Sequence, residues 1–73
     1  MHEMPQKITI QVNGEPHTLF SGSSVNDLLA DIGSDGKTVA TLINNRIVRP
    51  EHRRNCRLEN GDHVEILIFA GGG

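Results

Sequence analysis

Residues 7–14 read KITIQVNG, and this stretch decides the fold. Polar and apolar residues alternate up to the asparagine, which is the period-two pattern of a strand with one buried face. Asn13 and Gly14 follow directly, and both residue types tolerate the positive φ angles of a two-residue hairpin turn. The returning strand is expected at 16–20, with Pro16 at its start because proline has no backbone N–H to donate. The chain therefore opens with a β-hairpin.

A short amphipathic helix is expected after the hairpin. Ser24 is placed to cap its first turn by accepting a hydrogen bond from the amide of Asp27, whose negative charge also suits that end of a helix. Gly33 is placed to stop the helix, since glycine adopts a left-handed cap easily. One apolar stripe at positions i, i+3, i+4 and i+7 consists of Val25, Leu28, Leu29 and Ile32.

Three further strands are expected, at 38–43, 46–48 and 63–69, with a charged connection at 50–57. The element order is then strand, strand, helix, strand, short strand, strand. This order predicts an α+β fold, in which one helix packs across one face of a mixed sheet. The first and last strands are expected to pair in parallel at the centre of the sheet, with the helix as part of the crossover.

Length and composition exclude several classes of protein. At 73 residues with a net charge of -2, the chain is one small domain without the basic excess of a nucleic-acid binder. Cys56 is the single cysteine, so no internal disulfide can form, and no apolar stretch reaches the length of a membrane span. Phe20 and Phe69 are the only aromatic residues, so the core must be aliphatic. We expect a cytoplasmic, monomeric domain.

The end of the sequence is rich in glycine. We expect a flexible leader at 1–6, a folded domain at 7–69 and a flexible tail at 70–73. The tail contains Gly71, Gly72 and Gly73, and glycine neither packs nor stiffens a fold. A strand that leads into glycines would present the Gly73 carboxylate to a narrow partner site. The alternative is a frayed end without function.

The last predicted strand also offers a docking surface. If Val64, Ile66 and Ile68 face the core, the alternate residues face outward. Leu67 and Phe69 would then form an exposed apolar pair just before the tail, as expected of a partner site. The alternative is that this pair packs beneath the charged connection.

Other chemically suggestive residues carry less weight. Five arginines lie within 46–57, and we favour a solvated segment, neutralised by nearby acids, over an anion or acidic-partner patch. Cys56 is expected to be a buried or half-buried thiol without catalytic function. The histidines show no metal-ligand spacing, and the chain has no phosphate-binding loop. The arginines are Arg46, Arg49, Arg53, Arg54 and Arg57.

Four stretches together resemble the ubiquitin-like sulfur carrier family, most closely its thiamine-type branch (ThiS), which is related to MoaD. The stretches are the hairpin turn at 13–14, the helix start at 24–29, the segment LINNRIV at 42–48 and the ending at 62–73. The third glycine of the tail and the six-residue leader depart from the most familiar pattern of that family. The resemblance implies a β-grasp fold and a carrier that catalyses no reaction of its own.

The resemblance also implies partners and chemistry. An E1-like adenylyltransferase (ThiF type) would use ATP and Mg²⁺ to adenylate the carboxylate of Gly73. Sulfur from a persulfide donor would replace AMP, and the resulting thiocarboxylate would supply thiazole synthase (ThiG type) in thiamine biosynthesis. This chain itself would bind no metal or cofactor and contain no catalytic residue. Open alternatives are the small subunit of molybdopterin synthase, a carrier for cysteine or homocysteine synthesis, a ubiquitin-like protein modifier, and a plain interaction module.

Overall fold

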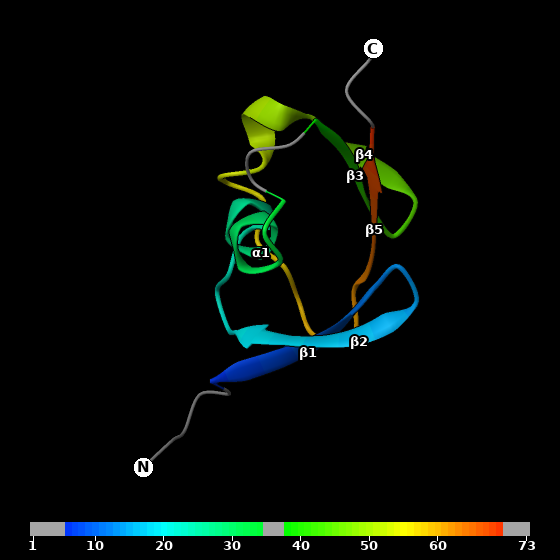
Figure 1. The fold of residues 1–73 in the computed structure, drawn as a ribbon. Coiled ribbons are helices and arrows are strands. Elements are labelled where there is room, and N and C mark those ends of the chain that lie inside the picture. Colours follow the sequence, from blue (N-terminus) through cyan, green and yellow to red (C-terminus); the bar gives the residue numbers. More distant parts are fainter. Residues whose placement is uncertain (1–5, 35–37, 70–73) are drawn as a thin grey trace.

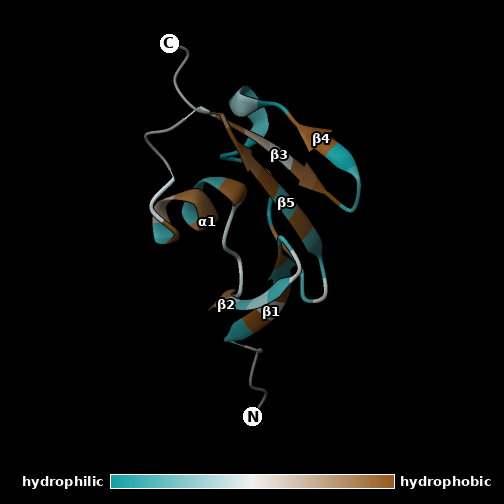
Figure 2. Ribbon diagram, turned by 45° about the vertical axis from the view of Figure 1, so that its right-hand side comes forward, coloured by the Kyte–Doolittle hydropathy of each residue, from teal (hydrophilic) through white to brown (hydrophobic). Residues whose placement is uncertain are grey.

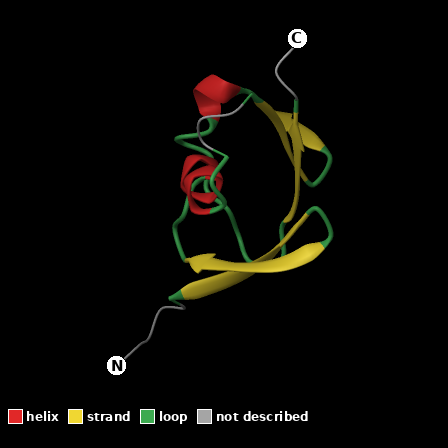
Figure 3. Cartoon of the chain, viewed as in Figure 1, coloured by secondary structure: helices red, strands yellow, loops and turns green. Residues whose placement is uncertain are grey.

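The computed structural model describes residues 6–34 and 38–69. They form five strands, one α-helix and one short 3-10 helix (Figure 1; Figure 3). In chain order the elements are β1 (Lys7–Val12), β2 (Glu15–Phe20), α1 (Val25–Asp31), β3 (Val39–Ile43), β4 (Arg46–Val48), η1 (Pro50–His52) and β5 (His63–Ile68). Apart from Gln6, the predicted leader at 1–6 and the predicted tail at 70–73 lie outside the described residues.

The predicted elements are present with small changes in their bounds. β1 and β4 have the predicted bounds, whereas β2 begins one residue earlier, at Glu15. β3 begins one residue later than predicted, at Val39, and β5 ends one residue earlier, at Ile68. The charged connection contains η1, a short helix that the sequence did not predict. Pro50 begins η1, a position where the missing N–H of proline removes no hydrogen bond.

The sheet is mixed and has the strand order β2-β1-β5-β3-β4. β1 and β5 run parallel at its centre, and the other neighbouring pairs are antiparallel. The predicted central pairing is therefore confirmed. The sheet curves around α1, which lies on its concave side (Figure 1), and the brown, hydrophobic side of the helix turns toward the strands (Figure 2). This α+β arrangement, with one helix across a five-stranded mixed sheet, is the predicted fold class.

The helix begins as the sequence predicts. The Ser24 hydroxyl accepts a hydrogen bond from the Asp27 amide at 3.2 Å, and the Asp27 carboxylate accepts one from the Ser24 amide at 2.8 Å. The second bond completes a capping box. Both hydrogen bonds with Ser24 lower the pKa of Asp27 below its ordinary value, and the bond from the Ser24 backbone amide has the larger effect.

Within the described part of the chain, no helix has the length and apolar character needed to cross a membrane.

The core is aliphatic, as predicted from a sequence with only two aromatic residues. Both phenylalanines are exposed, Phe20 at 66% and Phe69 at 54% of their surface. The buried hydrophobic residues come from both layers and from the loop before β5: Ile8, Ile10, Leu19, Val25, Leu28, Leu29, Val39, Leu58, Val64 and Ile66. Ile32, predicted to belong to the apolar stripe, is only partly buried.

Asn13 joins the opening hairpin to the last strand. Its φ angle of 51° places it in the left-handed region, as predicted for a two-residue hairpin turn. The parallel ladder between β1 and β5 has two register pairs, the second being Val12 with Val64. Beyond it, the Asn13 side chain accepts a hydrogen bond from the Ile66 amide at 2.8 Å and donates one to the Ile66 carbonyl at 3.1 Å. The side-chain amide of Asn13 therefore makes the two hydrogen bonds to β5 that one further residue of β1 would make.

Replacing Asn13 by glycine should remove this bridge and leave the turn conformation accessible. We expect Asn13→Gly to lower the free energy of unfolding by about 2 kcal/mol, since each lost hydrogen bond contributes about 1 kcal/mol. Asn45→Gly is the matched control, because Asn45 also has a positive φ angle, 72°, but its side chain has no hydrogen bond among the described residues. Urea denaturation of the two variants measures the difference, and equal stabilities would contradict a structural role for the Asn13 amide.

Candidate functional site

The end of β5 exposes apolar side chains on the outer face of the sheet. Leu67 is 52% exposed and Phe69 is 54% exposed. The Phe69 amide donates a hydrogen bond to the Thr38 carbonyl at 3.0 Å, so the chain stays strand-like one residue beyond β5. The prediction that Leu67 and Phe69 face outward is confirmed, and the alternative that they pack beneath the charged connection is wrong. Their role as a docking pair remains a prediction.

Ile68 is the residue that departs from the predicted pattern. It was expected to face the core together with Val64 and Ile66, yet 55% of its surface is exposed. Val64 and Ile66 are buried because β1, or the Asn13 side chain, runs beside them. The ladder with β1 ends before Ile68, and only Val39 of β3 remains as a strand neighbour. Ile68 therefore lies on the predicted face, which it shares with the buried Val39, but it is not buried there because burial ends where the neighbouring strand ends.

A wider apolar surface extends from Leu67 across the outer face. Leu67 pairs with Ala40 on β3, and Leu42 of the same strand pairs with Ile47 on the edge strand β4. Paired residues share a face of the sheet, so these side chains lie on the same side as Phe69. Ile47 is 69% exposed. We call Ala40, Leu42, Ile47, Leu67 and Phe69 the outer apolar patch.

Ile47 was missed by the sequence analysis. A signal was present, since Ile47 lies between the polar Arg46 and the apolar Val48 in a three-residue strand. Alternation alone cannot decide which of two neighbouring apolar residues faces the core. The pairing of Ile47 with Leu42 decides it, and that pairing depends on the register of β4.

The other predicted site residues, Gly71, Gly72 and Gly73, lie outside the described residues. The described chain ends at Phe69, beside the beginning of β3.

The arginine segment makes few contacts with acidic groups. Arg53 donates from its guanidinium to the Val39 carbonyl at 2.8 Å, and Arg57 donates to the Gly22 carbonyl at 3.4 Å. Among residues 6–34 and 38–69, the one contact within salt-bridge distance joins the His17 ring to the Asp31 carboxylate at 2.9 Å. No carboxylate of the described residues lies within salt-bridge distance of these arginines, so their neutralisation by nearby acids stays a prediction. Arg46, Arg49 and Arg54 are nonetheless exposed to solvent.

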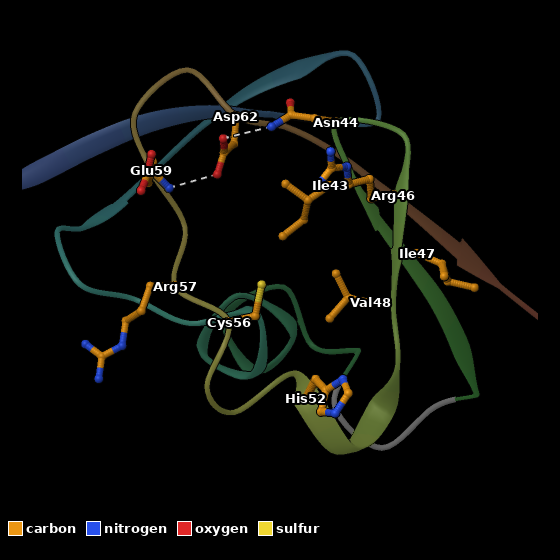
Figure 4. A pocket seen from close by; sticks show the side chains of 10 residues that line it. All are labelled: Ile43, Asn44, Arg46, Ile47, Val48, His52, Cys56, Arg57, Glu59 and Asp62. Carbon is orange, nitrogen blue, oxygen red and sulfur yellow. Dashed lines mark hydrogen bonds between the residues drawn. The ribbon is translucent and has the colours of Figure 1, made fainter.

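A groove of about 650 Å³ lies between β4 and the loop that leads to β5 (Figure 4). Ile43, Val48 and the Cys56 sulfur point into it. Asp62 closes one end, where its carboxylate accepts hydrogen bonds from Asn44 and from the Glu59 amide. Cys56 is half-buried, as predicted. In the described part of the chain, no group of three His, Cys, Asp or Glu side chains could hold a metal ion.

The mixed five-stranded sheet, its parallel central pair and the single helix on the concave face define a β-grasp domain of the ubiquitin-like class. Comparison with known sequences is more specific, because the sequence model of the ThiS family matches residues 10–73. The chain belongs to the ThiS family.

A solved structure supports this assignment. The thiamine biosynthesis protein (ThiS) of Geobacter metallireducens superposes with a TM-score of 0.76 and 29% sequence identity, covering 90% of this chain and 100% of that one. The shared fold and the resemblance predicted from the sequence are thereby confirmed.

Curated relatives include longer proteins. The thiazole synthase of Paramagnetospirillum magneticum is 34% identical over 62 residues, which is 85% of this chain and 19% of that protein. The thiazole synthase of Magnetococcus marinus is 33% identical over 64 residues, which is 88% of this chain and 20% of that protein. The ycf40 protein of Porphyra purpurea is 29% identical over 68 residues, 93% of this chain and 96% of that protein. The chain thus spans about a fifth of the two thiazole synthases.

Proposed function

We propose that this chain is a sulfur carrier of thiamine biosynthesis, with the Gly73 carboxyl group as the carrier group. The observation that carries the proposal is the ThiS family match, which extends through the glycines to residue 73. The similarity to the solved ThiS protein and to two thiazole synthases supports the same pathway. We propose that the protein is located in the cytoplasm.

The proposed chemistry activates a carboxylate. A carboxylate is a poor electrophile, because it is anionic and lacks a good leaving group. An E1-like adenylyltransferase would use ATP and Mg²⁺ to convert it to a mixed anhydride with AMP. The terminal sulfur of a persulfide donor would then displace AMP and form an acyl disulfide, and a thiol would reduce its S–S bond to release the glycine thiocarboxylate. The thiocarboxylate would supply its nucleophilic sulfur to thiazole synthase. All catalytic groups would belong to these partners, so the chain acts as a protein co-substrate.

The glycines of the tail would enter the partner's channel, and the outer apolar patch would supply the binding surface. Gly71 and Gly72 carry no side chain, so a narrow channel can admit the tail up to Gly73. Ordering each glycine in that channel costs about 1–2 kcal/mol of backbone entropy. Burial of exposed apolar side chains offsets such a cost at about 25 cal/mol per Å². Leu67 and Phe69 are the proposed docking residues, because they are exposed and immediately precede the tail.

Incubation with the cognate activating enzyme, ATP and a persulfide donor tests the carrier function. We expect the intact mass of the chain to rise by the difference between one sulfur and one oxygen atom. Deleting Gly73 should abolish this gain. Failure of the complete chain to gain this mass would contradict the proposal, and a ladder of conjugates to other proteins would indicate a protein modifier instead.

Substitution of Leu67 tests docking separately from folding. Leu67→Asp should weaken binding to the activating enzyme at least tenfold, yet change the free energy of unfolding by less than about 1 kcal/mol, because Leu67 lies at the surface. Ile66→Ala is the control on the opposite face, and it should lose about 2–5 kcal/mol of stability because Ile66 is buried. Titration calorimetry and urea denaturation measure the two effects. The reverse ranking would place Leu67 in the core.

A further inference from the structure

The last residues of β5 have an open backbone edge. In an antiparallel pair, the N–H and C=O groups of successive residues point alternately toward and away from the partner strand. The Phe69 amide points to β3, where it bonds to Thr38, whereas the N–H and C=O of Ile66 point the other way, to Asn13. Ile68 has the orientation of Ile66. Its N–H and C=O therefore face the side of β5 that β1 occupies further back.

No strand among the described residues lies beside this edge at Ile68. The pairing of β1 with β5 ends at Val64, and the Asn13 side chain extends it only to Ile66. Exposed strand edges in proteins are usually protected by charged side chains, proline or a bulge. Here the three residues at the edge are Leu67, Ile68 and Phe69, and none carries such protection.

The side chains at this edge are apolar and exposed. Leu67, Ile68 and Phe69 are exposed at 52%, 55% and 54%, although they belong to both faces of the sheet. A strand that is apolar on both faces is typical of a strand covered on both sides. The described residues leave about half of each of these three side chains uncovered, on both faces of the sheet.

We propose that a strand of thiazole synthase pairs with the Ile68 edge of β5 and covers Ile68 from the core side. Main-chain hydrogen bonds of such an added strand supply affinity, and the apolar side chains select the partner. The pairing would also hold the following residues extended as they enter the partner. This inference rests on the proposed function, since it names the partner that receives the tail.

Thiazole synthase is the chosen partner because of the two longer relatives. In both of them a segment similar to this chain is part of a polypeptide called thiazole synthase. Two domains that share one polypeptide are held at high local concentration, so their surfaces can meet without tight binding. The same pair of surfaces in separate chains would need added contacts, which an open edge and exposed apolar residues supply.

Proline at position 68 tests the backbone edge. Proline is tolerated in an edge strand where its missing N–H would face solvent, so Ile68→Pro removes the open donor and no described hydrogen bond. Ile68→Ala is the matched control for loss of the side chain. With purified thiazole synthase and the full chain, titration calorimetry should show roughly tenfold weaker binding for Ile68→Pro than for Ile68→Ala, consistent with the loss of one interfacial hydrogen bond.

Stability provides the second readout. Ile68→Pro and Ile68→Ala should unfold at similar temperatures, whereas Phe69→Pro should unfold at a lower temperature because it loses the bond to Thr38. Equal affinity of the proline and alanine variants for thiazole synthase would overturn the inference. A loss of stability in Ile68→Pro as large as that in Phe69→Pro would also overturn it. The same holds if Ile68→Pro binds the activating enzyme more weakly than Ile68→Ala does but binds thiazole synthase equally well.

The mass measurement separates this inference from the proposed function. If the complete chain gains sulfur and binds thiazole synthase, but Ile68→Pro binds as tightly as Ile68→Ala, only the strand pairing fails. If the complete chain neither gains sulfur nor binds thiazole synthase, the proposed function fails, and the inference fails with it.

Discussion

The pair of hydrogen bonds between the Asn13 side chain and the backbone of Ile66 is the constraint on which the rest of the structure depends. The central parallel ladder contains two register pairs, and this side chain lengthens it by one step. Among the described residues, β5 is therefore held between two neighbours up to Ile66 and by β3 alone at Ile68. Where the second neighbour stops, burial stops too, and the apolar end of the domain begins.

Much of the fold follows from local sequence. The alternation in β1, the Asn13-Gly14 turn and the capping box at Ser24 each depend on residues that are close together in the chain, so the sequence alone predicts them. The second role of Asn13 could not be predicted, because its partner lies 53 positions away. The exposure of Ile68 was missed for the same reason. Alternation predicts which face a side chain occupies, but the length of the neighbouring strand decides whether that face is covered.

The candidate site shows the same division. Leu67 and Phe69 could be predicted as outward-facing, since they continue the alternation that buries Val64 and Ile66. Ile47 joins them only through the register of β4 with β3, which its own three-residue strand does not specify. Gly71, Gly72 and Gly73 lie outside the described residues, so their role rests on the sequence and on the family match. In this account the domain supplies position and contact area, and the partner enzymes supply the chemistry.

Amide hydrogen exchange at single residues tests the central claim most directly. If Asn13 marks the end of the paired region, the Ile66 and Phe69 amides of the free chain should exchange slowly, because each has a hydrogen-bond partner, and the Ile68 amide should exchange fast. Thiazole synthase should slow exchange at Ile68 and change little at Ile66. Slow exchange of the Ile68 amide in the free chain, or an Ile68 amide that stays fast in the complex, would contradict the account.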